Sequence, residues 1–208
     1  MEAIILAGGK ATRLGEAAQG LPKALVPVAG QPLAAYQVAQ LVRAGVERVI
    51  VSCADGQSAS FEERLGGRGA EIVPVEEPEP LGRGGGLRWA AARRVETGPL
   101  YALNGDELHD VDLRSLLEAH RSHGAAATIV VAPLVSQFGV VELEDDRVAG
   151  FREAPRLPYW VNSGIYVLDP AEVRAAGFAY EGIGRQTPQF EALPETAELA
   201  ATPTDAIP

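Results

Sequence analysis

A chain of 208 residues is long enough for one well-buried domain and short for two, so we expect a single domain. Apolar residues make up 47% of the sequence, but no apolar run reaches the ~18 residues of a membrane span, so we expect a soluble protein that does not bind a membrane. The net charge of −10 argues against a nucleic-acid-binding surface, and an anionic ligand must therefore be drawn by a local basic cluster.

The amino terminus lacks the basic segment and apolar run of a secretion signal, so we expect a cytoplasmic protein. The one cysteine, Cys53, has no partner for an internal disulfide. It ends the apolar run RVIVSC, which predicts a buried residue without a chemical role.

The first informative stretch is EAIILAGGKATRLG, from Glu2 to Gly15. An apolar run from Ala3 to Ala7 leads directly into Gly8 and Gly9, which predicts a buried strand that opens into an anion-binding loop. The loop matches neither the dinucleotide fingerprint G-x-G-x-x-G nor the G-K-[ST] of a P-loop. It therefore indicates a third kind of phosphate loop.

Lysine occurs only at Lys10 and Lys23, and every other basic residue except histidine is arginine. Both lysines flank the glycine loop, and a compact ammonium suits a crowded phosphate better than a planar guanidinium does. The alternative is that both are ordinary surface lysines. Together with Arg13 they form the one basic cluster near the loop.

The rest of the first half alternates apolar strands with amphipathic helices, which predicts a doubly wound α/β sheet. We expect helices from Pro32 to Gly45, around residues 61–65, over 85–95 and after an N-cap at Asp112, and strands over 47–53, 70–75 and 100–103. Residues 76–88, EEPEPLGRGGGLR, are expected to form a loop that enters the third helix.

Asn104-Gly105-Asp106 ends a predicted central strand, at the edge of the sheet where ligands of such folds bind. A carboxylate there suits Mg²⁺, which usually takes one or two protein carboxylates and completes its shell with water and phosphate oxygens. As a bare tripeptide the same residues indicate an ordinary turn. The three histidines show no metal-ligand spacing and are expected at the surface or at helix ends: His109, His120 and His123.

The second half is predicted to contain a strand over 127–134, a hairpin and a strand over 159–170 with Asn162-Ser163-Gly164 at its start. The hairpin pairs residues 138–143 with 148–152 around a turn at Asp145-Asp146. A helix that starts at Asp169, a helix over 185–193 and a weak strand over 198–202 are expected to follow.

Two blocks in order, LAGGKATRLG and LPKALVPVAGQPL, resemble the L-A-G-G-x-G-T-R-L and P-K-x-L-x-P-V-x-G-x-P-L patterns of the sugar-1-phosphate nucleotidyltransferases. The resemblance implies one three-layer α/β/α domain of Rossmann-like type, with a mixed, mostly parallel sheet and a β-hairpin in its acceptor half. Residues 1–112 would form the nucleotide-binding half and 113–208 the acceptor half. Ala11 stands where the family usually has glycine.

The same resemblance implies Mg²⁺-dependent transfer of a nucleotidyl group from an NTP to a sugar 1-phosphate. It assigns Arg13 to the β- and γ-phosphates, Lys23 to the α-phosphate and the incoming oxygen, and Asp106 to the metal. The implied nucleotide-binding residues are Leu6, Ala7, Gly8, Gly9, Lys10, Ala11, Thr12, Glu77, Pro80, Gly82 and Gly84.

In the second half the runs FGV, FREAP and NSGIY resemble the acceptor motifs of the family, which implies that Gly139, Glu153 and Asn162 bind the sugar hydroxyls. Two features depart from the family. Ala154 replaces the lysine of E-K-P, and the D-x-G-T-P segment with a second metal ligand is absent before Pro208, where Asp205 is the only nearby acid. Either the chain is truncated or it has lost a ligand.

These departures leave two other functions open. One is a non-catalytic nucleotide-sugar sensor or regulatory subunit on the same fold, and the other is a cytidylyltransferase for a non-sugar phosphate. The base, the sugar and the oligomeric state, including a homo-oligomer, stay open.

Overall fold

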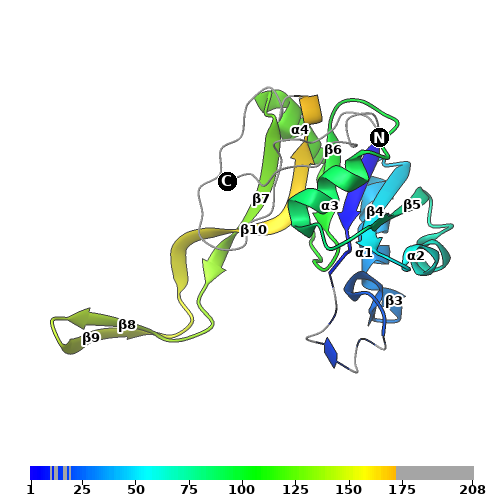
Figure 1. Cartoon of the computed structure of the whole chain (residues 1–208). Helices are drawn as coiled ribbons and strands as arrows, with labels where there is room; N and C mark the ends of the chain where they lie inside the picture. Colours follow the sequence, from blue (N-terminus) through cyan, green and yellow to red (C-terminus); the bar gives the residue numbers. More distant parts are fainter. Residues whose placement is uncertain (10, 12–13, 16–17, 19, 172–208) are drawn as a thin grey trace.

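The computed structural model describes residues 1–9, 11, 14–15, 18 and 20–171 (Figure 1). The expected helix over 185–193, the expected strand over 198–202 and Asp205 lie outside the described residues. The elements in chain order are β1 (Glu2–Leu6), η2 (Lys23–Leu25), β2 (Pro27–Val28), β3 (Gln31–Pro32), α1 (Leu33–Arg43), β4 (Arg48–Ala54), α2 (Ser58–Leu65), β5 (Glu71–Glu77), α3 (Gly82–Ala91), β6 (Leu100–Asn104), α4 (Leu113–His123), β7 (Ala127–Val135), β8 (Val140–Glu144), β9 (Arg147–Arg152) and β10 (Arg156–Leu168).

A six-stranded sheet in the order β5-β4-β1-β6-β10-β7 forms the centre of the described fold. The first four strands of this order run parallel, and β10 is antiparallel to both of its neighbours, β6 and β7. The mixed, mostly parallel α/β sheet predicted from the sequence is therefore confirmed. Among the described helices, none is both long and apolar enough to cross a membrane.

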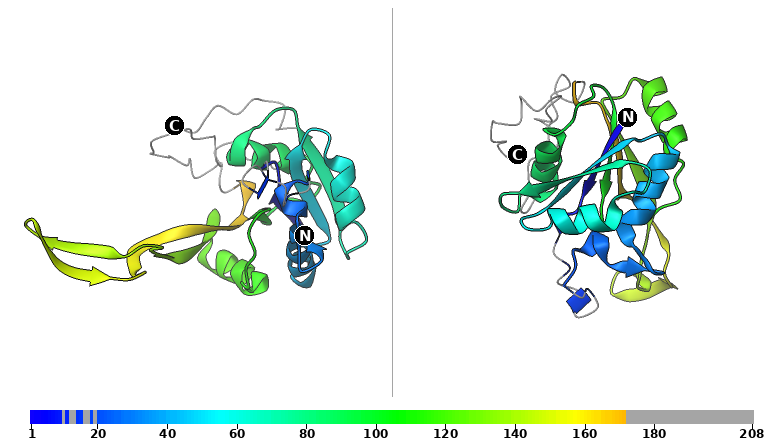
Figure 2. Two further views of the ribbon diagram at one scale, coloured as in Figure 1. Left: turned by 90° about the horizontal axis from the view of Figure 1, so that it is seen from below. Right: turned by 90° about the vertical axis from the view of Figure 1, so that its right-hand side faces the viewer.

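Helices cover both faces of the sheet, as Figure 2 shows. On one face, α1, α2 and α4 pack their apolar side chains, such as Val38, Phe61 and Leu117, against alternate residues of the strands. On the other face, α3 packs Leu87, Ala90 and Ala91 against the intervening strand residues. Alternate side chains of a strand point to opposite faces, so the unbroken apolar runs of β1 and β4 are what a sheet buried on both faces requires.

The chain leaves β1 toward β4 and β5 on one side and returns to β6 on the other side. The carboxyl ends of β1 and β6 are in register, with Leu6 opposite Asn104. In open α/β sheets the ligand binds where the strand order reverses in this way. The loops after β1 and β6 therefore meet at the edge where a ligand is expected.

Helix α3 corrects one expectation, because it begins at Gly82 and ends at Ala91 rather than spanning 85–95. The glycines at its start suggested a loop, but they allow the helix to approach its neighbours. A Cβ on Gly86 would lie 2.5 Å from Glu77 Oε1, and one on Gly85 would lie 2.8 Å from Leu81 Cβ. Close packing, rather than flexibility, explains the glycines.

Strand β10 is the second correction, since it begins at Arg156 and carries Asn162-Ser163-Gly164 in its middle. The pairing of β10 with β7 shifts between Asn162 and Tyr166, and Gly164 has a φ of 65°. This irregularity lets a polar tripeptide sit inside a strand, which the alternation of apolar residues did not reveal. The β2–β3 pair, which turns through Ala29 and Gly30 at positive φ, was not predicted either.

Helix α4 follows the prediction, with the Asp112 side chain capping it by accepting from the Arg114 N–H. His120 lies in the last turn of this helix, one of the two positions expected for it, and is only 2% exposed. Its Nδ1 lies 2.9 Å from Thr128 Oγ1 on β7, a partner that makes burial acceptable. Cys53 is fully buried, as predicted.

Strands β8 and β9 form a separate two-stranded sheet that projects from the body of the molecule (Figures 1 and 2). The hairpin turns at Asp145-Asp146 as predicted, and Asp145 takes a φ of 52°. Large apolar side chains on this hairpin and on the adjoining parts of β7 and β10 are exposed, among them Phe138, Phe151 and Trp160.

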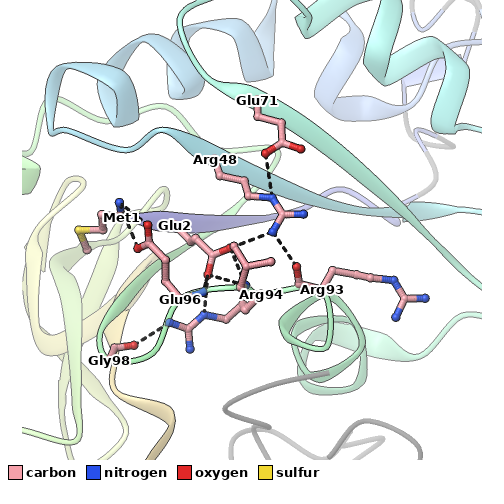
Figure 3. A network of polar contacts seen from close by, with 9 residues as sticks. Met1, Glu2, Arg48, Glu71, Arg93, Arg94, Glu96 and Gly98 are labelled. Atoms are coloured by element: carbon pink, nitrogen blue, oxygen red, sulfur yellow. Dashed lines mark hydrogen bonds and ion pairs between the residues drawn. The ribbon is translucent and has the colours of Figure 1, made fainter. Parts of the chain in front are cut away.

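The amino end of the sheet is tied together by a buried ionic network, shown in Figure 3. Glu2, at 1% exposure, accepts the backbone N–H groups of Val95 and Glu96, both at 3.0 Å, and pairs with Arg94 and Arg48. The network joins β1, β4 and the turn after α3. It lies at the end of β1 opposite to the glycine loop.

Candidate functional site

A cleft of about 280 Å³ opens at the carboxyl ends of β1 and β6. Its lining consists of Leu6, Ala7, Gly8, Gly9, Lys23, Ala24, Glu77, Pro80, Gly82, Arg83, Asn104, Gly105 and Asp106. Most of the described residues that the sequence assigned to a nucleotide therefore line this cleft. Lys23 and Asp106 line the same cleft.

Lys23 and Asp106 face each other across this cleft, from segments 83 residues apart in the sequence. Lys23 Nζ donates to Asp106 Oδ2 at 2.5 Å, and the two side chains are 42% and 39% exposed. The backbone of Lys23 is held in place because Lys23 begins η2, whose other two residues, Ala24 and Leu25, are buried. A cation and an acid held this close, and reached by solvent, can both turn toward a bound anion and its metal.

The Asp106 turn depends on a close approach between β6 and β1. The Gly105 N–H donates to the Leu6 carbonyl at 2.8 Å, and a Cβ on Gly105 would lie 2.7 Å from that same oxygen. Asn104 Nδ2 donates to Glu107 Oε1 at 2.9 Å across the turn. Glycine is therefore required here for space, and the turn presents Asp106 at the rim of the cleft.

Glu77, at the end of β5, is 8% exposed and holds the wall of the cleft in place. Its carboxylate accepts from Ser52 Oγ at 2.7 Å and from the Leu81 N–H at 3.0 Å. A Cβ on Gly8 would lie 3.0 Å from Glu77 Oε1, so the glycine loop passes directly over this carboxylate. Glu77 thus fixes the turn that leads into α3 while lining the cleft.

The amino-terminal end of α3 contributes Gly82 and Arg83 to the lining. Free backbone N–H groups and the helix dipole give such an end a partial positive charge. Arg83 is exposed and has no ion pair with another residue of the described part of the chain. Among the described lining residues, Lys23 and Arg83 carry the positive charge, which suits a polyphosphate.

Two titratable side chains outside the lining of the cleft are made inert by burial. Burial and the nearby carboxylates of Glu76 and Glu77 raise the pKa of Cys53 to about 11, so its thiol stays protonated at neutral pH and is no nucleophile. Burial also lowers the pKa of His109, which keeps that ring neutral near pH 7. Neither group is suited to covalent or acid–base chemistry in the cleft.

Other predicted site residues lie elsewhere. Ala11 is not among the lining residues, Gly84 is buried within α3, and Lys10, Thr12 and Arg13 lie outside the described residues.

None of the three residues assigned to the sugar, Gly139, Glu153 and Asn162, lines the cleft. Gly139 and Glu153 are neighbours at the base of the β8–β9 hairpin, since a Cβ on Gly139 would lie 3.1 Å from Glu153 Oε2. Asn162, in β10, accepts from the Gly164 N–H at 2.8 Å and donates to Tyr166.

The residues present fit a magnesium ion that arrives with a phosphate ligand. Within the described part of the chain, no group of three or more His, Cys, Asp or Glu side chains is placed to hold a metal. Asp106 is the lining carboxylate that reaches solvent, because Glu77 is buried and engaged by Ser52 and Leu81. One carboxylate plus phosphate oxygens and water is a common magnesium shell.

Comparison with protein-family models matches residues 2–198 to the family described as nucleotidyl transferase. The chain belongs to the nucleotidyl transferase family. The zebrafish (Danio rerio) mannose-1-phosphate guanylyltransferase catalytic subunit beta is 34% identical over 216 residues, covering 97% of this chain. This chain spans 58% of the length of that relative.

Two solved structures resemble this nucleotidyl transferase chain in fold. HddC from Yersinia pseudotuberculosis has a TM-score of 0.62 at 25% identity, covering 83% of this chain and 77% of HddC, and another HddC structure is a complex with GMP-PN. A putative glucose-1-phosphate thymidylyltransferase from Bacillus anthracis has a TM-score of 0.66 at 21% identity, covering 84% of this chain and 74% of that one. The second likeness shows the fold alone.

Sequence reasoning missed two buried polar residues that support the cleft. Gln37 and Ser52, both fully buried, hold the Asp106 turn and Glu77 from behind the cleft. The available signal was a polar residue inside an apolar stretch: Gln37 in the apolar face of α1 and Ser52 in the apolar run of β4. Buried polar groups are retained where they have hydrogen-bond partners.

Proposed function

We propose that this chain transfers a nucleotidyl group from an NTP to a sugar 1-phosphate and releases pyrophosphate, with Mg²⁺. The observation that carries the proposal is the contact of Lys23 with Asp106 inside a glycine-lined cleft at the point where strand order reverses. Family membership supports this class of reaction, and the cleft offers charged groups that such a reaction needs.

In this reaction an oxygen of the sugar phosphate attacks the α-phosphorus of the NTP in line. The new P–O bond forms as the bond to the β-phosphate oxygen breaks, and pyrophosphate leaves. The attacking phosphate is already ionised near pH 7, so the protein has to position the two anions and offset their charge. No covalent enzyme intermediate is needed, which agrees with the protonated thiol of Cys53.

Each charged group of the cleft has a proposed role. Lys23 contacts the α-phosphate and the incoming oxygen, and Arg83 contacts the outer phosphates from the start of α3. Asp106 would hold the magnesium ion, and the bound ion would offset negative charge on the phosphate oxygens. Arg13 and Lys10 are proposed to bind the leaving pyrophosphate by resemblance alone.

We propose GTP and mannose 1-phosphate as the first substrates to examine. Several relatives matched over most of this chain are named mannose-1-phosphate guanylyltransferases or guanyltransferases, and one HddC structure is a complex with GMP-PN. Backbone contacts from residues 76–86 would select the base. Gly139, Glu153 and Asn162 remain the proposed sugar contacts.

A second candidate function, a nucleotide-sugar-binding regulatory protein, is favoured by the acceptor half. Ala154, which replaces the family lysine, takes a φ of 42°, a conformation that costs a non-glycine residue on the order of 1 kcal/mol. The three proposed sugar contacts also lie outside the cleft. Such a protein would bind nucleotide sugar and turn nothing over.

Pyrophosphate release separates the two candidates. The purified chain is incubated with each of the four NTPs, a panel of hexose 1-phosphates including mannose 1-phosphate, and Mg²⁺ or EDTA. We expect release that requires all three components and is strongest with GTP and mannose 1-phosphate. Absence of release from every pair, with a nucleotide sugar that raises the melting temperature, would instead support the regulatory function.

A further inference from the structure

Gln37 is a fully buried polar residue on α1, among apolar neighbours of the core. Its Nε2 donates one hydrogen bond to the Asn104 carbonyl and another to the Glu107 carbonyl, both at 2.7 Å. A side-chain amide has two N–H donors, and both are used here. The helix behind the cleft therefore holds both ends of one short segment.

That segment is the turn from Asn104 to Glu107, in which Asp106 is the third residue. Three further contacts determine the turn: the Gly105 N–H on Leu6, the Asn104 amide on Glu107, and the Lys23 ammonium on Asp106 itself. Only the Gln37 amide bridges the first and last carbonyls of the turn among the described residues. Without it, two largely buried carbonyls would lose their partners, and the turn would rearrange to reach water.

We propose that Gln37 is a positioning residue that fixes the Asp106 carboxylate against Lys23, an inference that rests on the proposed function. It touches neither substrate nor metal. An amide is needed because a carboxylate at this place would repel both carbonyls, and an apolar side chain would leave both unpaired. Small displacements of a group that binds charge lower the chemical rate more than they weaken ground-state binding.

Gln40 provides a matched control on the same helix, three residues further along. Its Nε2 donates to the His109 carbonyl at 2.5 Å, which lies beyond the Asp106 turn. Q37M and Q40M each replace an amide by an apolar side chain of similar length, and each removes a hydrogen bond from α1 to the loop after β6. Only Q37M releases the turn that carries Asp106.

The first measurement needs no turnover. Amide hydrogen exchange of Gly105, whose N–H donates to Leu6, is compared in wild type, Q37M and Q40M. We expect the Gly105 amide to exchange at least about tenfold faster in Q37M than in Q40M. We also measure the dissociation constant of Mn²⁺ bound together with a non-hydrolysable GTP analogue, and expect it to be at least about fivefold higher in Q37M than in Q40M. Equal values in the two variants would overturn the proposal, whether or not the wild type catalyses nucleotidyl transfer.

The second measurement is kinetic. We expect kcat of Q37M to fall at least about tenfold with the KM for NTP changed less than threefold, and kcat of Q40M to stay within threefold of wild type. If Q37M only raises KM, or if kcat falls equally in Q37M and Q40M, the result contradicts a positioning role. If wild type itself shows no pyrophosphate release, the proposed function fails, and the exchange and Mn²⁺ data still decide the role of Gln37.

A second pair of variants serves if Q37M does not fold. In Gln37→Glu the neutral carboxyl has one O–H to donate, while the ionised form has none. We expect the activity of this variant, relative to Gln40→Glu, to fall as pH rises through the titration of the introduced carboxyl. Parallel pH profiles of the two variants would contradict the proposal.

Discussion

At the scale of single residues, the site depends on where a side chain is absent. Gly105 passes so close to β1 that any Cβ would lie 2.7 Å from the Leu6 carbonyl oxygen and 3.1 Å from Ile5 Cγ2. The first of these neighbours is backbone, which has no room to move within a central strand. The turn that presents Asp106 therefore exists because one residue has no side chain.

We predict that Gly105→Ala destabilises the fold by about 1–3 kcal/mol, the usual cost of inserting a group into a packed site. Gly9→Ala is the control, since a Cβ there meets nothing within 4 Å of the described atoms, and its effect should stay below about 0.5 kcal/mol. Urea unfolding of both variants measures the difference. Equal stabilities would show that the close approach to Leu6 is not a constraint.

At the scale of elements, the start of α3 brings a helix end and Arg83 to the cleft. An arginine that contacts the outer phosphates in both substrate and transition state contributes uniform binding. We predict that R83A raises the KM for NTP about fivefold with little change in kcat, as loss of ~1 kcal/mol of a charge-assisted contact implies. The steady-state kinetics of R93A, which removes the same charge away from the cleft, should match wild type.

The network around Glu2 joins three elements at the opposite end of the sheet (Figure 3). Glu2→Gln keeps the shape of the side chain but leaves the Arg94 guanidinium, at 1% side-chain exposure, without its charge partner. We predict a loss of about 3 kcal/mol in the free energy of unfolding, typical of breaking a buried ion pair. Glu96→Gln, whose carboxylate is 48% exposed and pairs with the Met1 amine, should cost less than about 1 kcal/mol in the same urea titration.

At the scale of the whole molecule, the structure has a hydrophobic core on each face of the central sheet and a hairpin that projects from this body (Figure 1). The hairpin has two strands, and Phe138 and Phe151 are 77% and 62% exposed. A two-stranded sheet without a covered apolar face is only marginally stable in water.

We therefore predict that backbone amides of β8 and β9 exchange with solvent at least about a hundredfold faster than those of β1 and β6. Hydrogen exchange followed by mass spectrometry measures this directly. Equal protection of the hairpin and of the central strands would mean that the hairpin is covered in solution.

The sequence predicted the central strands, most helices and many of the residues that line the cleft, because these follow from local patterns. Apolar runs indicate buried strands, and Gly8, Lys23 and Asp106 lie in short motifs at strand ends. It misplaced the start of α3 and of β10, where glycine and polar residues serve close packing and a bulge rather than a loop. Contacts between distant segments, such as Gln37 with the Asp106 turn, have no local pattern and required the structure.

The central proposal is that nucleotidyl transfer takes place in the cleft where Lys23 contacts Asp106. The most direct test is kcat/KM for pyrophosphate release by K23A and D106N, with R147A on the exposed hairpin as a control that removes one charge elsewhere. We predict losses of at least about a hundredfold for the first two variants, the magnitude for removing one preorganised electrostatic group, and less than threefold for R147A. A loss below threefold in K23A or D106N would contradict the account.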